Sequence, residues 1–115
     1  MKNYKIINPT VIHESMMNND SMVKQFVELY IAQCPLDFEA LAQTIKQGDH
    51  KAISSAAHHI KPTMEYIGAS NLRAHFQELE KLGSKESDIA DIIKKFEEIK
   101  PKFELMLEEL RYFNT

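Results

Sequence analysis

Turn-forming residues and cysteine are scarce in this sequence. The chain has 3 glycines and 4 prolines in 115 residues, which favours a few long helices over a many-stranded sheet. Cys34 is the only cysteine, so no disulfide can form within the chain, and we expect a reducing, cytoplasmic compartment. The formal net charge of -3 provides no basic surface of the kind that binds nucleic acid.

Long apolar runs are missing as well. Residues 1–9 lack the continuous apolar stretch of a signal peptide, and no run approaches the roughly 18–20 residues of a transmembrane helix. We therefore expect no membrane partner. Hydrophobic residues still make up 43% of the chain, which is enough to form the core of a single domain over residues 1–115.

Capping residues predict where the first two helices begin. Asn8 followed by Pro9 is typical of a helix start, and we expect a short helix from there to about Met17. Segment 18–21 then supplies the N-cap of a long second helix, in which Pro35 should cause a kink. The apolar face of this second helix comprises Val23, Phe26, Tyr30, Cys34, Phe38, Leu41 and Ile45.

Short polar or glycine-containing turns separate the remaining three helices. Residues 48–49 end the second helix and cap the third, residues 68–70 turn into the fourth, and residues 83–84 close the fourth. Ser87 or a near neighbour caps the last helix, which Pro101 should bend. The apolar stripes of these three helices are, in order, Ile53, Ala57, Ile60, Met64 and Ile67; Leu72, Phe76, Leu79 and Leu82; and Ile89, Ile92, Phe96, Ile99, Phe103, Met106, Leu110 and Phe113.

Amphipathic helices joined by short loops pack against their sequence neighbours in antiparallel fashion. The sequence therefore predicts an all-α fold, an antiparallel up-down four-helix bundle with a short additional N-terminal helix that covers one end.

A histidine and a lysine follow one another at helical spacing on the solvent side of the predicted third helix. At roughly 100° per residue, His58 lies about 140° and Lys61 about 80° from the apolar line through Ile53. Their spacing is i,i+3, so the two polar groups can approach each other. A neutral imidazole is a nucleophile, and a nearby ammonium can hold an anion that the imidazole has accepted. This pairing suits reversible phosphorylation of the histidine.

The pattern alone leaves simpler interpretations open. His58 could equally be an ordinary solvated histidine, and Lys61 could be a solvated lysine whose stem lies beside the core. His59 points to the other side of the helix, where no cation follows at the third or fourth position. We expect surface or packing roles for the remaining histidines, which are His13, His50 and His75.

The residues around His58 form part of a longer motif. It comprises His58-x-Ile60-Lys61, then Ile67-Gly68-Ala69, and further on Leu72, Leu79 and Glu80. In an all-helical chain of this length, the motif resembles the histidine-containing phosphotransfer (HPt) domains of bacterial two-component relays. The resemblance extends over the second to fifth predicted helices.

The resemblance implies a role for each matching residue. His58 corresponds to the phospho-acceptor, Lys61 to the lysine that stabilises the phosphoryl group, and Glu80 to a neighbour of the imidazole. Gly68 corresponds to the glycine of the interhelical turn. Pro62 departs from the family, which usually has glycine there.

The resemblance also implies partners. We expect response-regulator receiver domains, and a hybrid histidine kinase, to bind a surface formed by Ser54, His58, Lys61, Pro62 and Glu65. The Mg²⁺ needed for transfer is expected on the receiver, with no cofactor or metal bound by this chain. A monomeric phosphocarrier without ATP-dependent kinase activity of its own is therefore predicted.

Two alternative functions remain. The first is a pseudo-HPt protein that binds a kinase or receiver without carrying phosphate, although the intact His58 and Lys61 favour a carrier. The second is a metal-binding bundle that uses His58, His59 and Glu65, although adjacent helical residues point apart.

Pro62 also bears on the predicted shape of the third helix. It removes the N–H that would bond the carbonyl of His58, which costs about 3 kcal/mol in an ordinary helix interior. This is tolerable if the carbonyl faces water. We therefore expect the third helix to continue through Pro62 to about Ile67, with a bend that opens toward solvent.

Overall fold

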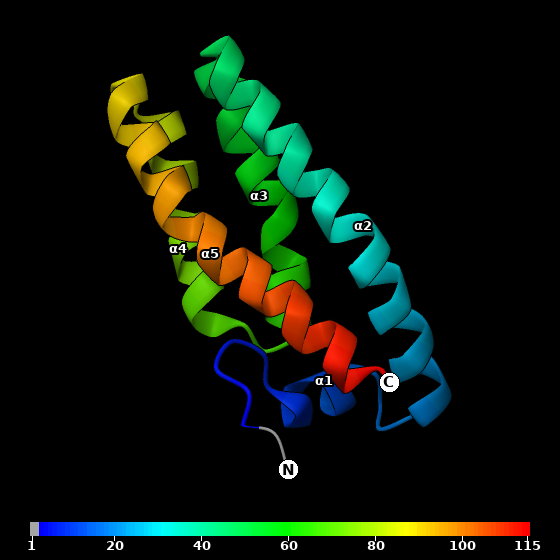
Figure 1. The fold of residues 1–115 in the computed structure, drawn as a ribbon. Helices are drawn as coiled ribbons and strands as arrows, with labels where there is room; N and C mark the ends of the chain where they lie inside the picture. The colour runs from blue at the N-terminus through cyan, green and yellow to red at the C-terminus, as the bar shows by residue number, and fades with distance from the viewer. Residues whose placement is uncertain (1–2) are drawn as a thin grey trace.

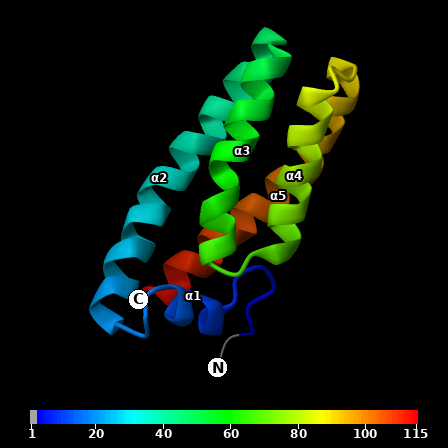
Figure 2. The ribbon, with the colours of Figure 1, turned by 180° about the vertical axis from the view of Figure 1, so that it is seen from behind.

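The computed structural model describes residues 3–115, and every regular element in this part of the chain is a helix. The helices are α1 (Pro9–Ser15), α2 (Asp20–Gln47), α3 (His50–Tyr66), α4 (Ser70–Ser84) and α5 (Ile89–Phe113). The four long helices lie side by side, and α1 lies across one end of them (Figures 1 and 2). The predicted all-helical bundle with a short N-terminal helix is confirmed.

The connections between the long helices alternate between the two ends of the bundle. The α2–α3 and α4–α5 turns lie at the end far from α1, whereas the α3–α4 turn lies beside α1 (Figure 1). The molecule is elongated, with extents of 43 × 22 × 19 Å. No helix within residues 3–115 has the length and apolar character needed to cross a membrane.

The first three helices begin with the predicted capping residues, whereas within residues 3–115 no side chain caps α4 or α5, so the predicted cap of the last helix by Ser87 or a near neighbour is wrong. The Asn8 side chain accepts a hydrogen bond from the backbone N–H of Thr10, Asn19 caps α2, and Asp49 caps α3. The first helix ends at Ser15, slightly before the predicted end near Met17. The reason is local: Met17 adopts a φ of 55°, which is incompatible with a continuing right-handed helix.

Each predicted in-helix proline lies inside a helix, and none terminates it. Pro35 lies in α2, Pro62 in α3 and Pro101 in α5. Helix α3 continues through Pro62 to Tyr66 and is capped by Ile67, as predicted. The bends at these prolines stay predictions.

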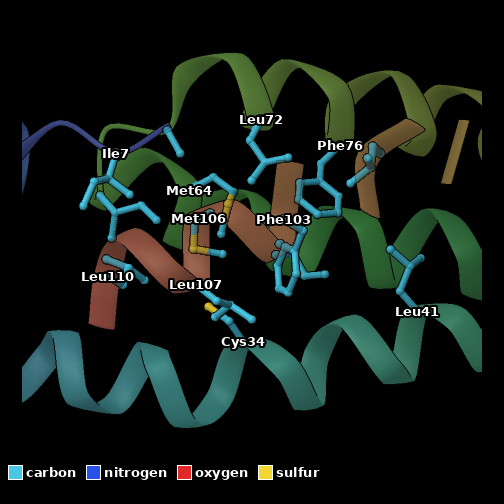
Figure 3. Packing of buried hydrophobic residues seen from close by; sticks show 14 of the residues in the cluster. Ile7, Cys34, Leu41, Met64, Leu72, Phe76, Phe103, Met106, Leu107 and Leu110 are labelled. Carbon is cyan, nitrogen blue, oxygen red and sulfur yellow. The ribbon is translucent and has the colours of Figure 1, made fainter. Parts of the chain in front are cut away.

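The core forms where the apolar stripes of all four long helices meet. Figure 3 shows Cys34 from α2, Met64 from α3, Leu72 from α4 and Met106 from α5 converging between the helices. All five predicted stripe residues of α3 are buried. Their burial fixes which face of α3 remains available to solvent.

One predicted core position of α2 is wrong. Phe26 is 38% exposed, whereas the adjacent Val27 is fully buried. The buried positions of α2 follow the spacing from Val23 to Val27 and on to Cys34, so Phe26 lies at the edge of the stripe. Its ring lies instead beside Tyr30, with 6.2 Å between the ring centroids.

Helices α3 and α4 approach each other closely at Gly83. A Cβ atom at this position would lie 2.9 Å from the backbone nitrogen of Ser54 and 3.0 Å from the carbonyl oxygen of His50. Only glycine leaves space for this approach. This close contact brings polar side chains of α3 and α4, one helical turn away from Gly83, within reach of each other.

The N-terminal segment is fastened to the bundle by Glu109. This side chain on α5 is only 1% exposed, and its carboxylate accepts backbone hydrogen bonds from Lys5, Ile6 and Ile7 at 2.8–3.0 Å. One residue later, the backbone N–H of Asn8 donates to the carbonyl of Ile67 at 3.0 Å. The segment therefore links α5 to the turn that follows α3.

Candidate functional site

A row of polar side-chain pairs joins α3 to α4, the two helices nearest the viewer in Figure 2. Along the row, the partner on α4 moves toward the N-terminus as the residue on α3 moves toward the C-terminus, so these two helices run in opposite directions. The pairs are Ser54 with Ser84, His58 with Glu80, Lys61 with Gln77, and Glu65 with Arg73.

His58 lies in the middle of this row and is open to solvent. Its side chain is 68% exposed, and its Nδ1 lies 3.1 Å from Oε2 of Glu80. Because a carboxylate can only accept, we assign the proton to Nδ1, which donates to Glu80. The lone pair of the neutral ring is then on Nε2, the nitrogen that does not contact Glu80.

Lys61 is not on the solvent surface, and the prediction of a solvent-exposed ammonium is wrong. The residue is 9% exposed, and its Nζ lies 2.6 Å from Oε1 of Glu80. Nζ also donates a hydrogen bond to Oε1 of Gln77. The reason is the intermediate position of Lys61 on α3, because a side chain about 80° from the core line faces the neighbouring helix α4.

Glu80 therefore connects His58 to Lys61 through its two carboxylate oxygens. Burial opposes the charged form of Glu80, but its contacts with the Lys61 ammonium and then with His58 outweigh this effect. The pKa of the Glu80 carboxyl consequently lies below its usual value. At neutral pH Glu80 is therefore a carboxylate, held between the side chains of Lys61 and His58.

The other predicted surface residues flank this centre. Ser54 is half-buried and lies 2.8 Å from the Ser84 hydroxyl, whereas Pro62 and Glu65 are exposed on α3. Glu65 lies 3.8 Å from Arg73. The structure thus places the five predicted contact residues on or beside one side of α3, with Lys61 alone withdrawn from the surface.

Gln77 belongs to the site but was not predicted from the sequence. It lies three residues before Glu80 on α4, so both side chains lie on the same side of that helix. This spacing was visible in the sequence. It could not show, however, that Lys61 would reach across from α3.

Two other histidines differ from His58 in their contacts. The Nε2 of His59 faces α2 instead, 3.8 Å from Oδ1 of Asp37. His75 is largely buried, and its Nδ1 lies 2.7 Å from the ammonium of Lys95, which can only donate. A proton on Nδ1, as in His58, is therefore excluded for a neutral His75.

The described residues do not provide a set of side chains suited to binding a metal ion. Within residues 3–115, no group of three or more His, Cys, Asp or Glu side chains could hold a metal ion. His58 and His59 diverge toward different helices, as expected for neighbours on a helix.

The family model described as Hpt domain matches residues 25–113, from the first turns of α2 to the end of α5. The chain belongs to the Hpt domain family. The resemblance found in the sequence is thereby confirmed, and with it a phosphotransfer role in two-component systems, in which Hpt domains interact with receiver domains and histidine kinases. No curated protein and no solved structure matches the chain.

Proposed function

We propose that this Hpt domain is a phosphocarrier in which His58 accepts a phosphoryl group from a receiver aspartate and passes it to another receiver. The observation that carries the proposal is the anchoring of His58. Its Nδ1 is bound to Glu80 while the side chain remains 68% exposed, which leaves the Nε2 lone pair free to react.

Each polar group has a part in the proposed transfer. Nε2 of His58 attacks phosphorus in line, the N–P bond forms, and the P–O bond to the aspartate breaks, which releases the aspartate as a carboxylate. The ring gains positive charge, which the Glu80 carboxylate offsets through Nδ1–H. The Lys61 ammonium attracts the phosphoryl oxygens, so that the chain supplies positioning and charge neutralisation.

The receiver would supply the other half of the active site. Its phosphorylated aspartate and the Mg²⁺ would approach the side of α3 that displays Ser54, His58, Pro62 and Glu65. Lys61 lies below this surface, so it would contact the phosphoryl group rather than the receiver itself. A hybrid histidine kinase is the expected source of phosphate, and we place the reaction in the cytoplasm with a monomeric carrier.

The antiparallel up-down order of the four long helices belongs to the same proposal. The pairing of α3 with α4 in opposite directions supports it, as does the alternation of the turns between the two ends (Figure 1). In this order His58 would lie on the side of the bundle, away from the turns.

The direct test is transfer from a set of phosphorylated receivers to the purified protein, followed by detection of acid-labile, base-stable label. Wild type and His59→Gln should become labelled, and His58→Gln should not. Label that persists in His58→Gln but is lost in His59→Gln would show that His59, and not His58, carries the phosphoryl group. A wild-type protein that binds receivers but never becomes labelled would favour the pseudo-HPt alternative.

A further inference from the structure

Gln77 contacts the reactive centre, yet no residue of the recognised motif corresponds to it. Its Oε1 accepts a hydrogen bond from Nζ of Lys61. The other contact of Nζ, with Oε1 of Glu80, is close at 2.6 Å, but the buried Oε1 atom lacks hydrogen-bond alignment with it. The Lys61 ammonium therefore has two contacts on α4, one with the neutral amide of Gln77 and one with the Glu80 carboxylate.

The charges of the site change when phosphate arrives. Before transfer, the Glu80 carboxylate is shared between Lys61 and a neutral His58. After the N–P bond has formed, the ring is cationic with its proton on Nδ1, and the phosphoryl group is an anion. Glu80 is then drawn to the ring and Lys61 to the phosphoryl oxygens, so the contact between Glu80 and Lys61 weakens. The neutral amide of Gln77 is subject to neither attraction.

We propose that Gln77 is a positioning residue that anchors the Lys61 ammonium throughout the transfer, so that a free N–H of Lys61 reaches the phosphoryl group on His58. An ammonium has three N–H donors. Of the described residues, Gln77 and Glu80 provide contacts for two of them, which leaves the third for a phosphoryl oxygen. The inference rests on the proposed phosphocarrier function and extends it to a residue outside the motif.

A double-mutant cycle tests this role. Wild type, Gln77→Leu, Lys61→Ala and the double variant would be compared for the rate of phosphoryl acceptance and the lifetime of phospho-His58. Gln77→Leu should reduce the acceptance rate, the lifetime or both by about ten- to a hundredfold, the range expected for a hydrogen bond to a charged group. If Gln77 acts through Lys61, the double variant should resemble Lys61→Ala. Effects that multiply would overturn the proposal.

A conservative variant separates positioning from packing. Gln77→Glu keeps an acceptor oxygen at the same reach, so Lys61→Ala should again cause a large loss in that background, unlike in Gln77→Leu. A small effect of Lys61→Ala in both backgrounds would count against the proposal. If Gln77→Leu fails to fold, Gln77→Ala can replace it in the same cycle.

Gln43→Leu on α2 is the matched control. It removes an exposed glutamine side chain whose hydrogen bond, at 2.8 Å, goes to Glu39 of its own helix rather than to Lys61. Transfer kinetics should stay at the wild-type level in this variant. A loss as large as that of Gln77→Leu would show a general structural effect and overturn the positioning role.

Failure of this inference is distinguishable from failure of the proposed function. If wild type becomes labelled on His58 but Gln77→Leu matches it in rate and lifetime, the phosphocarrier function stands and the role of Gln77 is refuted. If wild type never becomes labelled, both are refuted.

Discussion

The ion pair between Lys61 and Glu80 gives a prediction for both stability and phosphotransfer. The Lys61 and Glu80 side chains are 11% and 21% exposed, and Nζ and Oε1 lie 2.6 Å apart. An exposed pair is worth about 0–1 kcal/mol, whereas breaking a fully buried pair costs about 3–5 kcal/mol. Because the Lys61–Glu80 pair is only partly exposed, it lies between these limits, and we expect removal of the Lys61 ammonium to cost about 2 kcal/mol of stability.

Lys61→Met is the cleanest perturbation, because it keeps an unbranched apolar stem and removes the charge. It should lower the free energy of unfolding by about 2 kcal/mol and the melting temperature by roughly 8 °C. Urea denaturation would measure the first quantity and a thermal scan the second. Lys51→Met, at an exposed position on the same helix, is the control and should change stability by less than about 0.5 kcal/mol.

A second variant tests the physical reason. Glu80→Gln combined with Lys61→Met leaves no unpaired charge, so the double variant should recover about 1 kcal/mol relative to the sum of the two single losses. Phospho-His58 should still decay faster in both Lys61 variants, because the phosphoryl group has lost its cation. A Lys61→Met protein as stable as wild type, or losses that simply add, would refute the assigned energetics.

Further predictions concern four positions. Gly83→Ala should lower the free energy of unfolding by about 1–3 kcal/mol in urea denaturation, because a Cβ would lie 2.9 Å from the Ser54 nitrogen; a stabilised variant would contradict the close approach. The lowered pKa of Glu80 contributes stability at neutral pH that is lost as the pH falls below the ordinary value of 4.5, so wild type and Glu80→Gln should converge in stability on acidification. Burial raises the pKa of the Cys34 thiol to about 12, and the native protein should react with a thiol reagent at pH 8 far more slowly than the urea-unfolded chain; equal rates would contradict this burial. Pro62→Gly should keep phosphotransfer in the labelling assay, and a well-folded variant unable to accept phosphate would reveal a role for the proline ring.

Local features of the chain were predictable because they depend on short-range physics. Asn19 and Asp49 cap their helices through hydrogen bonds that span three residues, and the α3 stripe follows from helical periodicity alone. The exposure of His58 also followed, since its angle from the stripe is large.

The contacts that organise the site depend on how two helices are aligned, which periodicity does not determine. Lys61 has an intermediate angle on α3, and only the alignment of α4 decides whether it meets solvent or Glu80. The same alignment brings Gln77 into the site. Phe26 and Val27 differ for a related reason, because neighbouring positions can each extend an apolar stripe until packing selects one.

The contact between Glu109 and residues 5–7 bears on where this domain can be cut. The matched family region begins at residue 25, so a fragment trimmed to that region would lose all three backbone donors of a carboxylate that is 1% exposed. The same cut would remove the buried side chains of Ile7, Ile12 and Met16, so Glu109 and the apolar surface beside it would meet water. We therefore expect a fragment that keeps residues 5–24 to be more stable than one that starts at residue 25, because the N-terminal segment completes the bundle through both backbone hydrogen bonds and buried side chains.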